Sequence, residues 1–142
     1  MAKKSTLYHI YNDLVEAMNP IVGEKNIFLK NRPKIADGDV PMKKFIVIDL
    51  PISIRDYVIG NRKTYLTTRG VFYLFTQARK NDTLDINAMG DLVDGVVDLF
   101  PISGDYVVAT NPVVQMTGSD KAGFQVTTVT FDLRSKWGAF EK

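Results

Sequence analysis

Three aspartates along one predicted helix are the residues of this sequence that come closest to a chemical site. Asp91, Asp94 and Asp98 stand at positions i, i+3 and i+7, which places them on one side of a helix. Carboxylates grouped in this way can hold a metal ion or exchange protons with a substrate. No histidine or second acidic motif accompanies them, and an amphipathic helix needs charge on its solvent side. We therefore expect a solvated or subunit-contact face.

Other residues with chemical potential are few. The sequence has no Cys and one His, which excludes thiolate zinc sites, iron–sulfur clusters, disulfides and a Cys nucleophile. His9 has no Asp or Ser motif around it, and Asp37-Gly38-Asp39 is most simply a turn. The glycine motifs of phosphate sites, dinucleotide sites and nucleophile elbows are absent from the sequence. We expect no enzyme activity, no cofactor and no metal.

A basic and aromatic segment makes nucleic-acid binding the alternative function. Residues 69–75, Arg-Gly-Val-Phe-Tyr-Leu-Phe, share a basic residue, a glycine and interleaved aromatics with an RNA-recognition strand. Phe72 stands where that signature has a small residue, and Val71 stands where it has its first aromatic. We expect these aromatics to belong to the core, with the nearby Arg and Lys side chains at an interaction edge. A small nucleic-acid-binding module remains the alternative.

Length, composition and charge indicate what kind of protein contains these residues. The chain of 142 residues, 45% hydrophobic and 24% charged, suits one globular domain, to which we assign residues 1–142. It has no apolar run of the ~18 to 20 residues that cross a bilayer and no signal-like start, so we expect a soluble protein without a membrane segment. Residues 55–80 hold six bases and one acid, whereas residues 81–100 hold five Asp and no base. One edge is expected to be basic and another acidic.

Apolar periodicity predicts two helices. The first begins at Ser5 or Thr6 and ends near Pro20, because proline lacks an N–H and restricts the residue before it. The second begins at an Asp or Thr N-cap within 82–85 and ends before Pro101. Its apolar stripe consists of Ile86, Met89, Val93, Val96, Val97 and Phe100.

Strands account for most of the remaining chain. Residues 43–50 form a continuous β-branched run, which is typical of a central strand covered on both faces. The strand-like segments are residues 26–30, 43–50, 62–79, 106–116 and 124–134, the last two forming a C-terminal hairpin. This order predicts an α+β fold, with two helices packed on a mostly antiparallel sheet. The core should contain Leu14, Met18, Val47, Phe72, Leu74, Val93, Val97 and Phe131.

The order of these elements, together with the residues at their ends, has a counterpart in a known family. The matching features are a helix ending in Pro20-Ile21-Val22-Gly23, a proline-bearing loop at 31–41, strands at 45–48 and 65–78, a helix at 86–100 and a hairpin finishing in Phe131-Asp132-Leu133. This arrangement, over about residues 6–135, resembles the tail terminator, or tail completion, proteins of tailed bacteriophages. The resemblance implies a small α+β fold, a ring assembly at the neck end of the tail, and no catalytic residue.

The same resemblance implies where the protein works and what it contacts. It would be a virion structural protein, made in the host cytoplasm, that caps the tail tube or joins tail to head. Its partners would be other copies in a closed ring and neighbouring neck, portal-adaptor or tail-tube proteins, and whether DNA passes through the ring is left open.

Charge suggests how copies of this chain would meet. The Asp face of the second helix is expected to meet the basic segment 55–69, or the loop from Lys30 to Lys44, of a neighbour. The candidate subunit-interface residues are Arg62, Lys63, Asp91, Asp94 and Asp98. The candidate partner-contact residues in loops are Arg32, Lys34, Lys43, Lys44 and Arg55.

Overall fold

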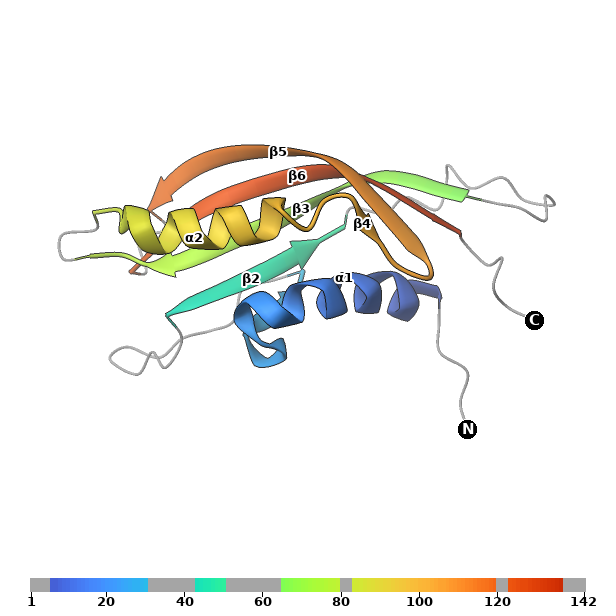
Figure 1. Ribbon diagram of the computed structural model, residues 1–142, viewed down its shortest axis with the longest axis horizontal. Coiled ribbons are helices and arrows are strands. Elements are labelled where there is room, and N and C mark those ends of the chain that lie inside the picture. The colour runs from blue at the N-terminus through green and yellow to red at the C-terminus, as the bar shows by residue number, and fades with distance from the viewer. Residues whose placement is uncertain (1–5, 31–42, 51–64, 80–82, 120–122, 137–142) are drawn as a thin grey trace.

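The described part of the chain forms one six-stranded sheet with two helices on the same face (Figure 1). The computed structural model describes residues 6–30, 43–50, 65–79, 83–119 and 123–136. The elements are α1 (Thr6–Val22), a 3-10 turn η1 (Glu24–Asn26), β1 (Ile27–Leu29), β2 (Lys44–Asp49), β3 (Tyr65–Gln77), α2 (Ile86–Val97), β4 (Ile102–Ser103), β5 (Val107–Ser119) and β6 (Phe124–Lys136). The predicted α+β class is confirmed.

The strands lie in the order β1-β2-β3-β6-β5-β4. β1 pairs parallel to β2, and every other neighbouring pair in the sheet is antiparallel. The short extended piece expected at 26–30 is therefore an edge strand, and the C-terminal hairpin is β5 with β6. β4, which no local sequence pattern predicted, pairs only with the start of β5.

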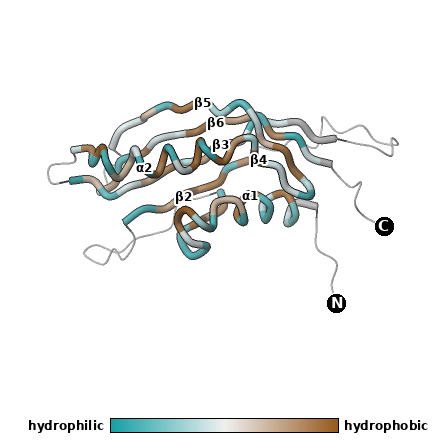
Figure 2. The backbone as a smooth tube through the Cα atoms, in the orientation of Figure 1, coloured by the Kyte–Doolittle hydropathy of each residue, from teal (hydrophilic) through white to brown (hydrophobic). Residues whose placement is uncertain are grey.

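Apolar side chains are buried on both faces of the sheet. The helix side holds the larger cluster, in which α1 covers β1 and β2 while α2 covers β3 and β6 (Figure 2). On the other side, Phe45 stacks on Phe75 with ring centroids 4.4 Å apart, and Phe124 meets Phe45 edge-on at 5.1 Å. β2 therefore has buried residues on both faces, as its β-branched run predicted.

Helix α1 ends later than predicted. It continues through Pro20 to Val22, and the Gly23 N–H then bonds to the Asn19 carbonyl at 2.8 Å. Gly23 has a φ of 85°, a left-handed conformation that glycine adopts without strain. Since Val22 is buried, the last turn extends the apolar face of the helix. Gly23, rather than Pro20, marks the end of α1.

Helix α2 is rotated relative to the predicted stripe. Its N-cap is Asp85, whose Oδ1 accepts the Ala88 N–H at 3.2 Å, within the predicted range. The residues that it buries against the sheet are Met89, Leu92 and Val96. The expected core positions Val93 and Val97 are only half-buried, and Ile86 is 57% exposed. Val93 packs against the core cluster without being fully buried, whereas Val97 is not part of it, so the predicted core placement was wrong for Val97. Val47 is buried, but in the cluster on the other face.

The basic and aromatic strand β3 has a packing reason for its composition. Phe72 is fully buried and Phe75 is 6% exposed, so the prediction that these aromatics belong to the core is confirmed. Gly70 lies directly opposite Phe131 in the sheet, and the Phe131 ring occupies the space that a β-carbon at residue 70 would need. The glycine of this segment therefore makes room for a core ring.

Candidate interaction surface

Strand β5 presents a free edge along most of its length. It pairs with β6 on one side, while on the other β4 reaches only Val108 and Ala109. In the described part of the chain, no strand pairs with residues 110–119 on that side. The backbone groups of residues 110–118 on that side are open to another strand, which is the usual route for strand addition.

The free part of β5 also carries exposed apolar side chains. Val113 is 56% exposed, Val114 42% and Met116 54%, and no residue of Val107–Ser119 is charged. Soluble proteins commonly protect an edge with Lys or another charge. β5 instead has Pro112 and two register shifts, which limit pairing only locally. An edge of this kind is suited to contact with another molecule.

One flank of α2 adds to this apolar surface. Gly95 identifies the flank that faces α1, because a β-carbon there would lie 3.5 Å from Ile21. Successive helix residues are rotated by about 100°. Val93 and Val97, two positions from Gly95, and Ile86, nine positions away, therefore lie on the opposite flank, toward β5. α2 packs over β3 and β6, so this flank faces the β5 edge.

These residues define one surface, which we call the β5–α2 surface. Val114 and Met116 are opposite Val129 and Thr127 of β6, whose side chains lie on the helix side, so they share a face with α2. A β-carbon at Gly90, on the same flank of α2, would have no atom within 4 Å. The members of the β5–α2 surface are Ile86, Gly90, Val93, Val97, Val114 and Met116.

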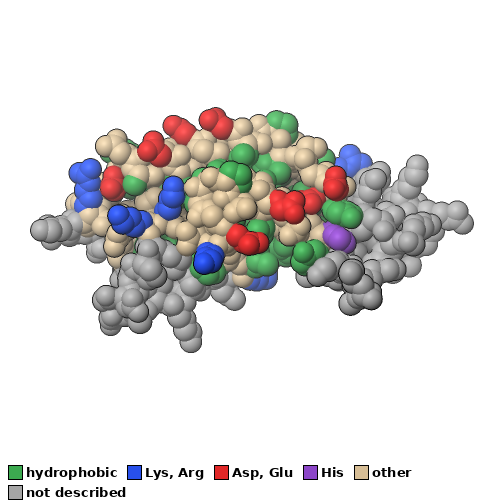
Figure 3. Space-filling model, turned by 60° about the horizontal axis from the view of Figure 1, so that its bottom comes forward, with side chains coloured by type: hydrophobic (Ala, Val, Ile, Leu, Met, Phe, Trp, Pro, Cys, Tyr) green, Lys and Arg blue, Asp and Glu red, His purple; other side chains and the backbone are tan. Residues whose placement is uncertain are grey.

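The acidic residues predicted from the sequence lie on the outer side of the same helix. Asp91, Asp94 and Asp98 are all exposed, and none belongs to an ion pair between described residues. Figure 3 shows several acidic side chains in a row along one rim, with further acidic side chains elsewhere on the face, and most of the visible basic side chains toward one end. That these aspartates contact a neighbour stays a prediction. Among described residues, no cluster of three or more His, Asp or Glu side chains is placed to hold a metal ion.

The opposite edge of the sheet is basic. Residues 23–30 and 43–50, which contain β1 and β2, hold four Lys and two acids. Lys25, Lys43 and Lys44 are exposed, and Lys30 bonds to Asp49 at 3.2 Å. That hydrogen bond raises the pKa of Lys30, so its charge is retained. Residues 83–119, which contain α2 and β5, hold five Asp and no base. The two edges therefore differ in sign.

The remaining candidate residues of the sequence analysis lie outside the described part. Arg32, Lys34, Arg55, Arg62 and Lys63 fall in segments 31–42 and 51–64. The structure thus brings Asp91, Asp94 and Asp98 together on α2. It places Lys43 and Lys44 near the opposite edge of the sheet, at the start of β2. The exposed residues of β5 were not among the residues predicted from the sequence. Their signal was a strand of thirteen residues without charge and with an internal proline.

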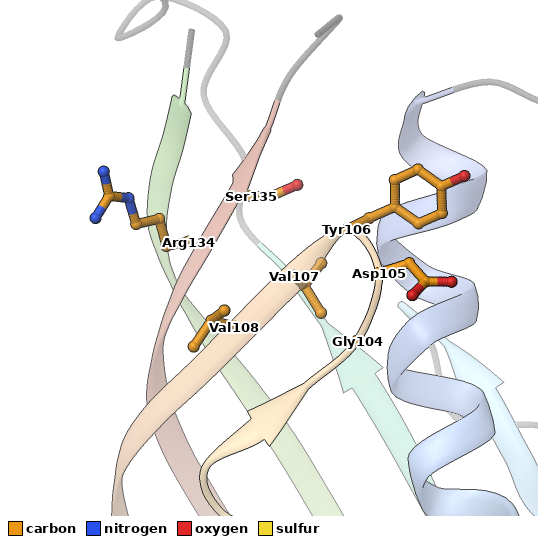
Figure 4. A pocket seen from close by; sticks show the side chains of 7 residues that line it. All are labelled: Gly104, Asp105, Tyr106, Val107, Val108, Arg134 and Ser135. Atoms are coloured by element: carbon orange, nitrogen blue, oxygen red, sulfur yellow. The ribbon is translucent and has the colours of Figure 1, made fainter. Parts of the chain in front are cut away.

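A small hollow near the start of β5 has a structural explanation. It measures about 290 Å³ and is lined by residues 104–108, Arg134 and Ser135. Arg134 extends away from α1, whereas Asp105 and Tyr106 extend toward it, so the polar groups do not converge on one point (Figure 4). The Tyr106 ring stacks on His9 with centroids 4.2 Å apart.

Asp13 connects α1 to the turn beside this hollow. Its Oδ2 accepts the Tyr106 N–H at 2.7 Å, and Gly104 leaves room for the carboxylate. Burial raises the pKa of Asp13, and the N–H groups of Tyr106 and Val107 offset only part of this rise. These contacts join secondary-structure elements, which is the role we assign to Asp13.

No described helix is long and apolar enough to span a membrane.

Comparison with known proteins supports the fold. No protein-family model matches the chain, and no curated protein gives a significant match. A solved structure of a protein with no descriptive name is similar, with a TM-score of 0.52 and 15% sequence identity. The similarity covers 93% of this chain and 94% of that one. At this identity the likeness extends to the fold alone.

Proposed function

We propose that this chain is a structural subunit of a bacteriophage virion, which assembles with copies of itself into a closed ring in the neck or tail. In that position it caps the tail tube or joins the tail to the head. Its sequence resemblance to tail terminator proteins, over about residues 6–135, supports this function. So does the α+β fold, in which both helices cover one face of the sheet.

The observation that carries the proposal is the open, uncharged edge of β5. A monomer with such an edge risks uncontrolled strand pairing. A ring of head-to-tail contacts covers every edge and stops growth when it closes. The opposite signs of the β1–β2 and α2–β5 edges favour contact between unlike edges, since like edges would repel.

Mass measurement tests the ring. Light scattering after size-exclusion chromatography is expected to give one assembly of fixed subunit number over a hundredfold range of protein concentration, and electron microscopy is expected to show closed rings. An open series of masses that grows with concentration would contradict closure. A monomer that binds DNA or RNA with a steep salt dependence would instead favour the nucleic-acid-binding alternative.

Charge reversal tests the electrostatic part. Asp94→Lys combined with Asp98→Lys is expected to weaken assembly, because exposed ion pairs contribute ~0.2 to 1 kcal/mol each and recur around a ring. The loss should be larger at low salt than at high salt. Addition of Arg62→Glu and Lys63→Glu is expected to restore assembly partly if the segment at 55–69 is the partner. Normal assembly of the aspartate variant at every salt concentration would show that these residues only solvate α2.

A further inference from the structure

We propose that the joint between subunits is formed by the free edge of β5 in one copy and β1 of the next copy, with α1 of that next copy packed on the β5–α2 surface. This inference rests on the proposed function, and it names the two surfaces that meet.

Strand direction is compatible with this joint. β1 runs parallel to β2, and the antiparallel steps through β3 and β6 give β5 the opposite direction. A second copy added in the same orientation beyond β5 would therefore place its β1 antiparallel to β5. Antiparallel addition of a strand to an open edge is a common mode of recognition. In the described part of the chain, β1 pairs only with β2, so its other edge is also open.

The outer flank of α1 supplies the apolar counterpart. Tyr11 identifies this flank, because its hydroxyl oxygen accepts the backbone N–H of Leu50 at the end of β2. Asp13, two positions along, instead faces Tyr106 near β5. Tyr8 and Val15 lie three and four positions from Tyr11 and share its side of the helix.

Residues on this flank remain partly open to solvent. Tyr8 is 45% exposed, Val15 is half-buried, and Leu29 of β1 is 49% exposed. Leu29 lies opposite Ile48, whose side chain is on the helix side of the sheet. Leu29, Tyr8 and Val15 therefore form an apolar surface on the same face as α2, at the opposite edge of the molecule.

Placing a second copy beside the first in the same orientation covers both the β5–α2 surface of the first copy and the apolar surface of α1 and β1 in the second. When β1 of the second copy pairs with β5, its Leu29 joins Val114 and Met116 on the helix side of the extended sheet. Its α1, which covers β1 and β2, then lies beside the flank of α2 that carries Val93 and Val97. A joint with an apolar centre and charges at its rim is the usual anatomy of a stable interface.

Charge identifies the occupant as a second copy of this chain. The incoming edge contributes Lys25, which is exposed, and Lys30, which is paired with Asp49. The receiving side carries the exposed Asp91, Asp94 and Asp98 of α2, which have no ion-pair partner among the described residues. Pairing of two β5 edges would instead bring two acidic α2 helices to the same joint. Complementary charge thus favours β5 with β1 over β5 with β5.

Cysteine cross-linking tests the joint directly, because the natural sequence has no Cys. The double variant Leu29→Cys with Met116→Cys is expected to give a ladder of covalent multimers on a denaturing gel after mild oxidation. The matched control is Leu29→Cys with Arg69→Cys, since Arg69 is exposed within the sheet and away from both edges. The control and each single variant are expected to stay monomeric on the gel. Covalent dimers from Met116→Cys alone would overturn the joint in favour of paired β5 edges.

A second variant separates this joint from the ring itself. Val114→Glu with Met116→Glu changes exposed side chains, so the subunit should melt as the wild type does. Its assembly is expected to require at least about tenfold higher protein concentration than the wild type, at low and high salt alike. Intact rings from this variant would overturn the β5 joint and leave the ring function standing. A wild-type chain that is monomeric at every concentration would overturn both.

Discussion

Gly70→Ala is expected to destabilise the protein, although it adds one methyl group to a strand. The β-carbon would lie 2.6 Å from Leu50 Cδ2 and 2.7 Å from Phe131 Cε2, both closer than carbon atoms pack. Leu50 is 2% exposed and Phe131 1%, and the Phe131 ring packs on Phe72 at 4.4 Å. The neighbours of residue 70 therefore have little room to move aside.

The expected cost follows from two opposing effects. Forcing an extra methyl into a filled core costs about 1 to 3 kcal/mol. Replacing glycine by alanine recovers about 0.4 to 1 kcal/mol, because the unfolded chain has fewer conformations to lose. The difference is a fall in the free energy of unfolding of about 0 to 2.6 kcal/mol, and we expect the upper half of this range because Leu50 and Phe131 have little room to move aside. Denaturant unfolding of the dissociated subunit at low concentration measures it.

Two further variants make this reasoning refutable. Gly90→Ala is the matched control: no atom lies within 4 Å of its β-carbon, so it should stabilise α2 by about 0.5 to 1 kcal/mol. Phe131→Ala alone should cost about 3 to 5 kcal/mol. Combined with Gly70→Ala, it should cost at least about 1 kcal/mol less than the sum of the single effects, because the overlapping ring is gone. Strict additivity, or a stabilising Gly70→Ala, would refute the steric argument.

Two other substitutions test the packing of the helices. Burial raises the pKa of Asp13 in the folded protein, so the folded state favours the protonated carboxyl. Asp13 therefore contributes to the free energy of unfolding at low pH, and this contribution is lost as pH rises through the folded pKa. Asp13→Asn keeps an oxygen for the Tyr106 N–H, and its stability relative to the wild type should rise from pH 3 to pH 7 in urea titrations; a constant difference would contradict this. Phe72→Ala should cost about 3 to 5 kcal/mol but Val93→Ala only about 1, and equal shifts in melting would contradict the observed burial.

Local patterns predicted most of the secondary structure. β2 was predicted because a short, continuous β-branched run is typical of a strand that is buried on both faces. The hairpin was predicted because turn-forming residues separate two segments of alternating polarity. The predicted end of α1 was wrong because a proline was expected to end the helix, whereas Gly23, three residues later, ends it. A proline in a last turn loses one backbone hydrogen bond, but the buried Val22 stabilises that turn in compensation.

The orientation of α2 depends on contacts that local periodicity does not contain. Both Leu92 and Val93 are apolar, and a stripe through either one has a helical period. The choice is made by the neighbours of the helix, since α1 packs against Gly95 and the sheet lies beneath Leu92. The prediction placed Val93 at the centre of the buried face, whereas the structure places it at the margin. The excess of apolar residues on α2 is explained if that margin also contacts another subunit.

The edge position of β5 is a property of the whole topology. β6 pairs with β5 through a local turn, but it also pairs along its full length with β3, which precedes it by more than forty residues. That long-range pairing leaves β5 outside the sheet centre, and no pattern within β5 specifies it. Its composition is nevertheless informative once the topology is known. A thirteen-residue strand without one charge is costly at an edge that stays in water, because it invites aggregation. The simplest physical reason for that composition is that the edge is covered in the proposed ring, which is the state that the cross-linking experiment is designed to detect.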